Sequence, residues 1–413
     1  MSIPTPAIGL TEHHDLRTGN PPWDEKAWQP PAAGALPEGR VDVAIIGSGI
    51  MGSILAERLS AEGHSLAILD RRPPGCGSTA ASTAEIMWAM DVPLSTLAER
   101  IGEAEAARRW TRVYAAVRAL GARIDALGID AARVDRPTVY LAGGLLDEAG
   151  LQREQAMLAS HGLPSAYLDA GEIAGRFGIA PRAGLVADGG FEVDPVRLSH
   201  AMLSCAIGRG AHLRYPCDVV AIGESADGVR LDLADGGALS AGAVILAGGY
   251  ERASLFLPPA FSLLSSYVMA SAPGIAPLWR ENAMIWEASD PYLYVRTTAD
   301  GRIVAGGEDE ELVAEDARDA MLTGKAGAIA AKLEAMLGSG PIAVDRRWCA
   351  TFGNSPDGLP AIGRAANMRN VWLSAGFGGN GIAFAGLAAD ILSAALAGRE
   401  DVDAACFDPY RFS

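Results

Sequence analysis

Residues 41–70 of this chain read VDVAIIGSGIMGSILAERLSAEGHSLAILD, and this segment constrains the fold more than any other. The apolar run VDVAII is typical of a buried strand that ends at Gly47. The segment MGSILAERLSAEG has helical spacing and can end at Gly63, and HSLAILD predicts a second buried strand. Together they form a βαβ unit, whose strands must be parallel and joined by a right-handed crossover.

The glycines of GSGIMG stand in the GxGxxG register between the first strand and the helix. Gly47 permits a tight turn, Gly49 lets the backbone approach a pyrophosphate, and Gly52 lets the helix pack close to the sheet. The N-terminus of the helix supplies amide donors to the anion. Asp70 ends the second strand, where its carboxylate would accept hydrogen bonds from an adenosine ribose. We therefore expect a dinucleotide, either NAD or FAD, because Asp70 would repel the 2′-phosphate of NADP.

Composition excludes several classes of protein. The chain has 413 residues, of which 49% are hydrophobic, so two domains are the default. A net charge of −16 argues against a nucleic-acid partner, which requires a basic face. Five scattered cysteines without a CxxC pair argue against disulfides and structural zinc and suit a reducing compartment. We find no signal peptide and no apolar run long enough to span a membrane, so we expect a cytoplasmic protein without a metal site.

Later segments predict further elements. Residues 94–127 have the pattern of two amphipathic helices. Residues 227–250 predict a hairpin and a buried strand that runs into two glycines, and residues 291–308 predict a second hairpin. In the C-terminal region, a strand in NVWLSAG leads through a glycine-rich loop to a helix.

Two of these segments need a ligand to explain their composition. GSTAAS, at 77–82, is a run of small and hydroxyl residues at the start of a helix, which suits phosphates and which a nicotinamide-binding fold would not need. GFGGNGI, at 376–382, has four glycines in seven positions, and that density indicates a loop, a hinge or a ligand cradle in which bare backbone is required.

Together with PDGLPAIG at 356–363, these motifs make the chain resemble the D-amino-acid oxidase superfamily of flavoproteins, which includes glycine oxidase, sarcosine oxidase and γ-glutamylputrescine oxidase. The resemblance covers roughly residues 41–398. It implies an α/β protein with a glutathione-reductase-type Rossmann domain that binds FAD and an inserted α+β substrate domain on a mixed, largely antiparallel sheet. We expect an N-terminal Pro-rich arm, 1–36, similar to that of the γ-glutamylputrescine oxidase branch. The expected FAD domain comprises 37–93, 185–262 and 345–413, and the expected substrate domain comprises 94–184 and 263–344.

The resemblance also implies which residues hold FAD. The glycine-rich loop would lie at the pyrimidine end of the flavin, where a helix N-terminus stabilises negative charge on the reduced ring. Non-covalent binding is expected, with a covalent link through Cys349 as the alternative. The expected FAD-binding residues are Gly47, Gly49, Ile50, Met51, Gly52, Asp70, Arg71, Gly77, Ser78, Thr79, Ala81, Ser82, Val219, Ala247, Gly248, Gly376, Gly378, Gly379, Asn380, Gly381 and Ile382.

The family oxidises a carbon–nitrogen bond by passing hydride to flavin N5, after which the imine hydrolyses, and no strong catalytic base is required. A substrate carboxylate would suit an arginine near tyrosines. Tyr292, Tyr294 and Arg296 alternate along one predicted strand, and Arg296 is either that ligand or a surface ion-pair residue. Tyr267 is either a site residue or a core residue. Trp88 either faces the flavin or is buried without a role.

The glycine-rich loop departs from the sarcosine-oxidase-like pattern. Asn380 stands where that branch carries a histidine, and Ala383 stands where it carries the lysine that helps to activate oxygen. Asn380 is therefore included among the candidate catalytic residues, and the electron acceptor is either oxygen or another molecule.

The sequence thus predicts an FAD-dependent oxidoreductase that acts on a small amine or amino acid, and it leaves the substrate and the oligomeric state open. One alternative is an NAD-dependent dehydrogenase on a related fold. The other is a protein that binds FAD without turnover and serves as an assembly or scaffold partner.

Overall fold

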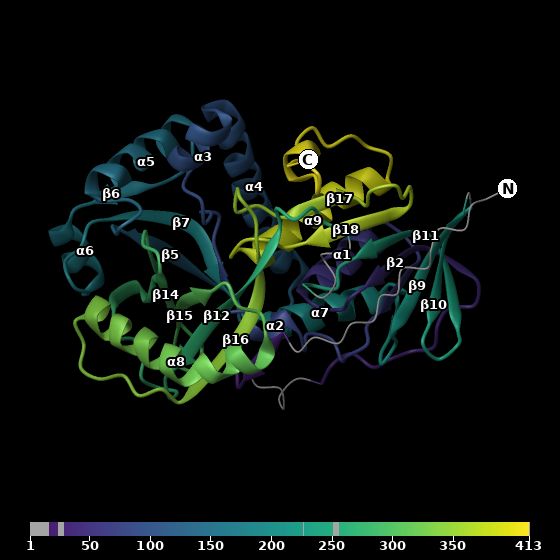
Figure 1. Cartoon of the computed structure of the whole chain (residues 1–413), viewed down its shortest axis with the longest axis horizontal. Helices are drawn as coiled ribbons and strands as arrows, with labels where there is room; N and C mark the ends of the chain where they lie inside the picture. The colour runs from purple at the N-terminus through teal and green to yellow at the C-terminus, as the bar shows by residue number, and fades with distance from the viewer. Residues whose placement is uncertain (1–15, 24–28, 226, 251–255, 413) are drawn as a thin grey trace.

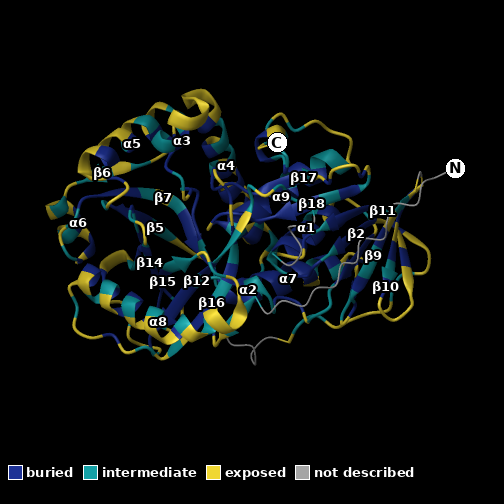
Figure 2. Cartoon of the chain, viewed as in Figure 1, coloured by how far each residue is buried: buried dark blue, intermediate teal, exposed yellow. Residues whose placement is uncertain are grey.

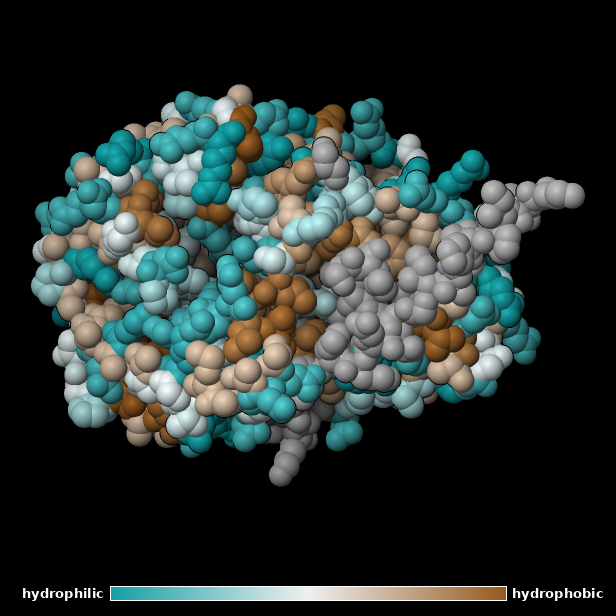
Figure 3. Space-filling view, in the orientation of Figure 1, coloured by the Kyte–Doolittle hydropathy of each residue, from teal (hydrophilic) through white to brown (hydrophobic). Residues whose placement is uncertain are grey.

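The computed structural model describes residues 16–23, 29–225, 227–250 and 256–412. Two sheets lie side by side, each with helices on its outer side (Figure 1). Buried residues are concentrated in the sheets and on the inward faces of the helices, and exposed residues lie on the outer faces of α3, α5, α6 and α8 (Figure 2). The surface in Figure 3 is mainly polar, with apolar residues in small groups, the most visible of them near the centre. The predicted α/β architecture is confirmed.

The first sheet is the one that the βαβ unit begins. Its order is β17-β18-β11-β2-β3-β8, with β10 and β9 attached in turn to β11. Strand β2 pairs in parallel with β3 and with β11, as a Rossmann-type domain requires. Its elements are β2 (Arg40–Ile46), α1 (Ile50–Ala61), β3 (Leu66–Leu69), α7 (Pro195–Gly208), β8 (His212–Arg214), β9 (Val219–Ser225), β10 (Gly228–Leu233), β11 (Ala238–Leu246), β17 (Ala361–Arg364), β18 (Val371–Ala375), α9 (Gly381–Leu396) and the 3-10 turn η3 (Ala404–Phe407).

Helix α1 is held between neighbours that are distant in the sequence. Its apolar residues join the largest core cluster with those of α9. Arg58 of α1 forms an ion pair with Asp390 of α9. Glu57, which is only 2% exposed, accepts hydrogen bonds from Arg123 and Arg209. These contacts fix the start of α1 relative to the sheet.

The second sheet has the order β1-β16-β12-β15-β14-β13-β5-β7-β4, with β6 paired to β7. Among its described strands, β13 and β5 form the parallel pair and the other pairs are antiparallel. Its elements are β1 (Arg17–Gly19), α2 (Ser78–Ala81), β4 (Glu85–Ile86), α3 (Leu94–Ile101), α4 (Glu103–Leu127), β5 (Val134–Leu141), α5 (Glu148–Ser160), β6 (Ala166–Leu168), α6 (Ala170–Phe177), β7 (Gly184–Glu192), β12 (Ser262–Ala270), η2 (Arg280–Asn282), β13 (Met284–Glu287), β14 (Leu293–Thr297), β15 (Ile303–Glu310), α8 (Glu315–Leu337) and β16 (Arg346–Asn354).

The local predictions match these elements. The two amphipathic helices are α3 and α4, and the two hairpins are β10–β11 and β14–β15. The C-terminal strand and helix are β18 and α9, joined by the glycine-rich loop.

The predicted domain boundaries differ from the sheets at three strands. β4, β7 and β16 belong to the second sheet, whereas the expected segments 37–93, 185–262 and 345–413 place them in the FAD domain. An apolar pattern identifies a strand but not its partner, and the partners of β7 and β16 are distant in the sequence.

The expected N-terminal arm is partly built into the fold. Residues 17–19 form β1, which pairs with β16. Trp23 is buried, with 7% of its surface exposed. Residues 1–15 and 24–28 of the arm lie outside the described residues. In the part of the chain that the structure describes, no helix is both long enough and apolar enough to cross a bilayer.

Candidate functional site

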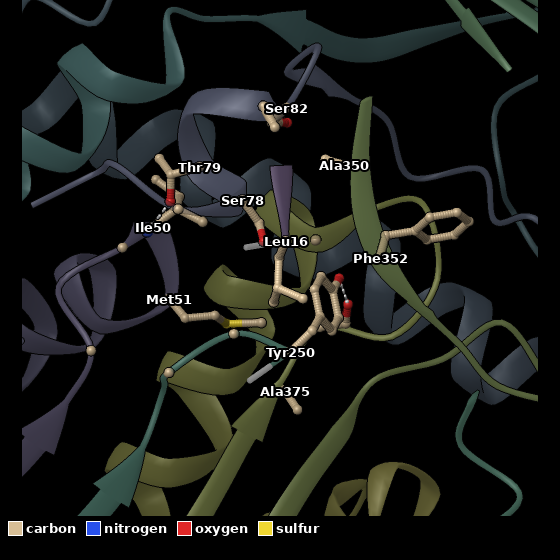
Figure 4. Close-up of a pocket in the computed structure, with 18 of the residues that line it drawn as sticks. Leu16, Ile50, Met51, Ser78, Thr79, Ser82, Tyr250, Ala350, Phe352 and Ala375 are labelled. Carbon is tan, nitrogen blue, oxygen red and sulfur yellow. Dashed lines mark hydrogen bonds between the residues drawn. The ribbon is translucent and has the colours of Figure 1, made fainter. Parts of the chain in front are cut away.

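A cavity of about 370 Å³ lies where the two sheets meet. Its walls come from segments far apart in the sequence. Figure 4 shows side chains of α1, α2, β16 and β18 arranged around the same open space, with Tyr250 beside them. The cavity extends from Asp70, at the end of β3, to Tyr294 on β14 of the second sheet.

The glycine turn between β2 and α1 forms one end of the cavity. Gly47 has φ +111°, and a Cβ on it would lie 2.4 Å from the carbonyl oxygen of Ala247. A Cβ on Gly52 would lie 1.9 Å from the carbonyl oxygen of Gly47, so the helix is packed directly against the turn. Gly49 precedes α1 with extended backbone and no side chain, so a ligand can approach the backbone at the start of the helix.

Asp70 is oriented towards this turn. Its Oδ2 accepts hydrogen bonds from the amide and the hydroxyl of Ser48, both at 2.7 Å. Its Oδ1 accepts one from the amide of Arg72 at 2.9 Å. Because a carboxylate oxygen can accept two hydrogen bonds, Oδ1 retains capacity for a ribose hydroxyl.

Helix α2 adjoins α1 on the wall of the cavity. The hydroxyl of Thr79 accepts a hydrogen bond from the amide of Ile50 at 2.9 Å and so ties the two helices together. Ser78 and Ser82 lie on the same wall (Figure 4).

The structure brings nearly all of the expected FAD-binding residues to this cavity. The exception is Gly52, which packs α1 against the turn without facing the space. The expected residues that line the cavity are Gly47, Gly49, Ile50, Met51, Asp70, Arg71, Gly77, Ser78, Thr79, Ala81, Ser82, Val219, Ala247, Gly248, Gly376, Gly378, Gly379, Asn380, Gly381 and Ile382.

The glycine-rich loop is closely packed against its surroundings. Gly378 has φ +93°, and a Cβ on it would lie 2.3 Å from the carbonyl oxygen of Gly358. Tyr250 donates a hydrogen bond to the carbonyl oxygen of Gly376 at 2.5 Å (Figure 4). The side-chain amide of Asn380 donates to the carbonyl oxygen of Ala89 at 2.7 Å, so that side chain is held by backbone.

The two tyrosines expected on the substrate side also line the cavity. Tyr292 lies just before β14 and Tyr294 lies on it, with ring centroids 5.9 Å apart. Tyr292 donates a hydrogen bond to Oδ2 of Asp309 at 2.7 Å. Tyr294 lies over Gly306, where a Cβ would come within 2.2 Å of its hydroxyl oxygen. Burial raises the pKa of both phenols, so both remain neutral donors at physiological pH.

Arg296 lies behind this wall and does not line the cavity. It is 2% exposed, donates a hydrogen bond to the carbonyl oxygen of Val193 at 3.0 Å, and pairs with Glu192 at 3.6 Å. Its guanidinium stacks on the ring of Trp23 at 4.9 Å. These contacts compensate the buried positive charge of Arg296, so a substrate carboxylate is not needed to stabilise it.

Three other residues considered from the sequence also lie away from the cavity. Tyr267 has no exposed surface and lies in the core beneath α8, where its hydroxyl donates to the carbonyl oxygen of Arg318 at 3.3 Å. Cys349 lies in the same core, and burial raises the pKa of its thiol to about 11, which does not favour a covalent flavin link. Trp88 is 2% exposed and donates to the carbonyl oxygen of Asp188 at 2.8 Å.

Sequence reasoning missed two carboxylates that line the cavity. Glu85 and Asp91 stand at the two ends of the segment EIMWAMD that follows the hydroxyl-rich helix, and acidic residues flanking an apolar run were the available signal. Burial raises the pKa of Glu85 to about 8, although Arg296 partly offsets that effect. Burial raises the pKa of Asp91 to about 6, although a hydrogen bond from the amide of Gly379 lowers it in part.

Comparison with known proteins matches this chain to a family model. The family model described as DAO, FAD dependent oxidoreductase, matches residues 42–395. The tRNA 5-methylaminomethyl-2-thiouridine biosynthesis bifunctional protein MnmC of Cupriavidus metallidurans is 26% identical over 422 residues, which cover 92% of this chain and 59% of that protein. The MnmC protein of Cupriavidus necator is also 26% identical, and 62% of it is covered. The chain thus spans about three fifths of these curated relatives.

Solved structures show the same fold at low identity. Glycine oxidase from Geobacillus kaustophilus has a TM-score of 0.71 and 21% identity, with 91% of this chain and 98% of that chain covered. L-Proline dehydrogenase from P. horikoshii has a TM-score of 0.71 and 19% identity, with the same coverage, 91% and 98%. L-Amino acid deaminase from Proteus myxofaciens has a TM-score of 0.73 and 16% identity, with 97% and 98% covered.

Proposed function

Because the chain belongs to the DAO family of FAD-dependent oxidoreductases, we propose that it oxidises the carbon–nitrogen bond of a small amine or amino acid. The observation that carries the proposal is the continuity of the cavity, since a dinucleotide-type glycine turn and a pair of neutral tyrosines open into the same space.

The residues present fit FAD. The glycine turn before α1 offers bare backbone to a pyrophosphate, and Asp70 retains acceptor capacity for a ribose. Gly381, at the start of α9, has no heavy atom within 4 Å of the position of a Cβ, so the backbone is open there. When bound, FAD supplies the acceptor for the hydride, that is, two electrons and one hydrogen from the carbon beside nitrogen, and water then hydrolyses the resulting imine to a carbonyl compound and an amine.

The chain's own residues would hold and orient the substrate. Tyr292 and Tyr294 are neutral and partly accessible from the cavity, and Trp286 lies beside them on β13. These rings exclude water from a small apolar substrate while the phenols offer hydrogen bonds. Hydride leaves the adjacent carbon only from the neutral amine, so an amine that binds as its ammonium ion must first lose a proton.

The NAD-dependent alternative is set aside by the family match, which is to FAD-dependent oxidoreductases. The scaffold alternative differs from the proposed reaction in one measurable outcome. It predicts that FAD binds but that no amine reduces it.

The test is anaerobic reduction of the FAD-loaded protein by a panel of D-amino acids, L-amino acids, N-methyl amino acids, simple amines and diamines. We expect at least one class to bleach the flavin absorbance near 450 nm. Oxygen is then admitted to the reduced protein. Rapid return of the colour with hydrogen peroxide identifies an oxidase, whereas slow return identifies an enzyme that uses another acceptor. Retention of full absorbance across the whole panel would contradict the proposed reaction.

Replacement of Gly306 by alanine tests whether Tyr294 contacts the substrate. The new Cβ would lie 2.2 Å from the hydroxyl oxygen of Tyr294 and would displace the ring. We expect KM for the best substrate of the panel to rise by about tenfold, the effect of losing roughly 1.4 kcal/mol of binding, while FAD affinity is unchanged. Gly144→Ala is the matched control, because nothing lies within 4 Å of a Cβ there. An unchanged KM in Gly306→Ala would exclude Tyr294 as a substrate contact.

A further inference from the structure

We propose that the second-sheet end of the cavity, formed by Asp91, Trp286, Tyr292 and Tyr294, binds a positively charged amine. Asp91 is the carboxylate that pairs with its ammonium group. This inference rests on the proposed function and narrows its substrate to amines that carry no carboxylate beside the bound nitrogen. It makes Asp91 a specificity-determining residue.

The arginines that line the cavity lie at a different end from Glu85 and Asp91. These arginines are held at the dinucleotide end. Arg71 and Arg72 directly follow Asp70, and Arg17 donates from Nε to the carbonyl oxygen of Cys76 at 2.7 Å. Among the described residues that line the other end, the acidic side chains are Glu85 and Asp91, and Asp91 is the one that is mainly ionised at pH 7.5. The substrate end is therefore acidic.

Asp91 is the carboxylate that a substrate can reach. It is surrounded by protein but exposed to the cavity, and so is its neighbour Gly379. The amide of Gly379 donates a hydrogen bond to Oδ2 of Asp91 at 2.5 Å, which fixes the carboxylate at the start of α9. Among the described residues, the charged side chain that acts most on Asp91 is another carboxylate, Asp309. No cation in the described part of the chain acts appreciably on Asp91, so an ammonium ion complements it.

Aromatic rings complete the enclosure. Trp286 stacks on Tyr140 with ring centroids 3.9 Å apart, which fixes its plane at the wall of the cavity. Tyr292 and Tyr294 form the adjoining part of that wall. The faces of such rings attract an alkylammonium group, and their apolar area receives its carbon chain.

The carboxyl group of Asp309 increases the negative character of this end, whereas Glu85, with its pKa raised to about 8, is mostly protonated at pH 7.5. Oδ1 of Asp309 and both carboxylate oxygens of Glu85 are buried without a hydrogen-bond partner. Because the oxygens of Glu85 are covered, they do not contact a ligand in the cavity. Arg296 stands on the far side of this wall and is already paired with Glu192. An amino-acid carboxylate placed here would meet repulsion and no guanidinium.

The experiment compares three ligands that share a tert-butyl body. Tert-butylammonium, pivalate and tert-butanol are titrated into the FAD-loaded protein, and binding is followed by the flavin difference spectrum and by calorimetry. None has a hydrogen on the carbon beside a nitrogen, so none can be oxidised and the readout is binding alone. We expect tert-butylammonium to bind and to compete with substrate, and pivalate to bind at least tenfold more weakly.

Asp91→Asn tests whether the carboxylate of Asp91 binds the ammonium ion. Asparagine keeps an oxygen that accepts from Gly379, so the loop is preserved while the charge is lost. We expect its affinity for tert-butylammonium at pH 7.5 to fall by at least tenfold and its affinity for tert-butanol to be unchanged. Asp135→Asn, at an exposed residue that pairs with Arg133, is the control and should bind as the wild type does. Equal affinity in Asp91→Asn and the wild type would overturn the proposal.

The pH dependence supplies a second readout. With its pKa raised to about 6, Asp91 is ionised above that pH and neutral below it. An alkylammonium ion, with a pKa near 10, stays charged throughout. Affinity for tert-butylammonium should therefore rise about tenfold between pH 5 and pH 7.5, because about a tenth of the carboxyls are ionised one unit below the pKa. The rise should shrink to less than twofold in Asp91→Asn. A larger remaining rise would assign the effect to Glu85 or Asp309, the other carboxyls at this end, and would contradict the role of Asp91.

The two proposals can fail separately. If no amine reduces the flavin but tert-butylammonium still binds through Asp91, the proposed reaction is wrong and the subsite stands. If amines reduce the flavin but Asp91→Asn binds tert-butylammonium normally, the reaction stands and the subsite is wrong.

Discussion

Replacement of Arg296 by methionine is expected to lower the free energy of unfolding by about 3 kcal/mol, the lower end of the range for breaking a buried ion pair. The guanidinium is 2% exposed and lies 3.6 Å from Oε2 of Glu192, an oxygen that has no hydrogen-bond partner. Without the guanidinium, Oε2 of Glu192 stays buried with no compensating positive charge, and the carboxyl group of Glu85 lies near it. The cost stays near the lower end because Arg136 still donates to the other oxygen of Glu192 at 3.0 Å.

The measurement is equilibrium unfolding in urea at saturating FAD, followed by circular dichroism. Arg230→Met is the matched control, because Arg230 also pairs with a carboxylate from a strand but its side chain is 63% exposed. That pair should contribute less than about 1 kcal/mol. If Arg296→Met unfolds like the wild type and instead loses affinity for carboxylate-bearing substrates, then Arg296 is a substrate ligand and its buried contacts are incidental.

Replacement of Gly52 by alanine is expected to weaken FAD binding by at least 100-fold, which corresponds to about 2.7 kcal/mol. The added Cβ would lie 1.9 Å from the carbonyl oxygen of Gly47 and 2.9 Å from its carbonyl carbon. Both are backbone atoms and cannot rotate away. Helix α1 must therefore move off the glycine turn, and its first amides move with it. The flavin content after purification and titration of the apoprotein with FAD report the effect.

Gly324→Ala is the control for this change. Gly324 also lies inside a helix, α8, but nothing is within 4 Å of a Cβ there. Alanine should leave FAD affinity unchanged and raise stability by up to about 1 kcal/mol, because glycine is a poor helix former. Tight FAD binding in Gly52→Ala would mean that the spacing between α1 and the turn is not what holds the cofactor.

The sequence predicted those features of the fold and the site that local patterns encode. The βαβ unit, the hairpin that ends at β15 and the strand–loop–helix around Gly378 follow from apolar periodicity and from glycine positions, and both are properties of neighbouring residues. Most of the expected FAD-binding residues reach the cavity for the same reason, because they belong to turns at the ends of strands.

The substrate side was less predictable because its contacts join distant residues. Alternation placed Tyr294 and Arg296 on one strand, but the partner of Arg296 is Glu192 on β7, a strand that the predicted boundaries assigned to the other domain. Asp91 accepts a hydrogen bond from the amide of Gly379, which lies 288 positions later in the sequence. No local pattern records such pairs, so the acidic character of the substrate end emerges only in three dimensions.

The wall contributed by β18 and by the first residues of α9 comes from the C-terminal part of the chain. Ribosomes make the chain from its N-terminal side, so β2, α1 and β3 emerge with the glycine turn well before the wall that encloses the opposite end. A nascent chain can present half of a binding site but cannot retain the cofactor. We therefore expect FAD to be captured only after β18 and α9 have been synthesised.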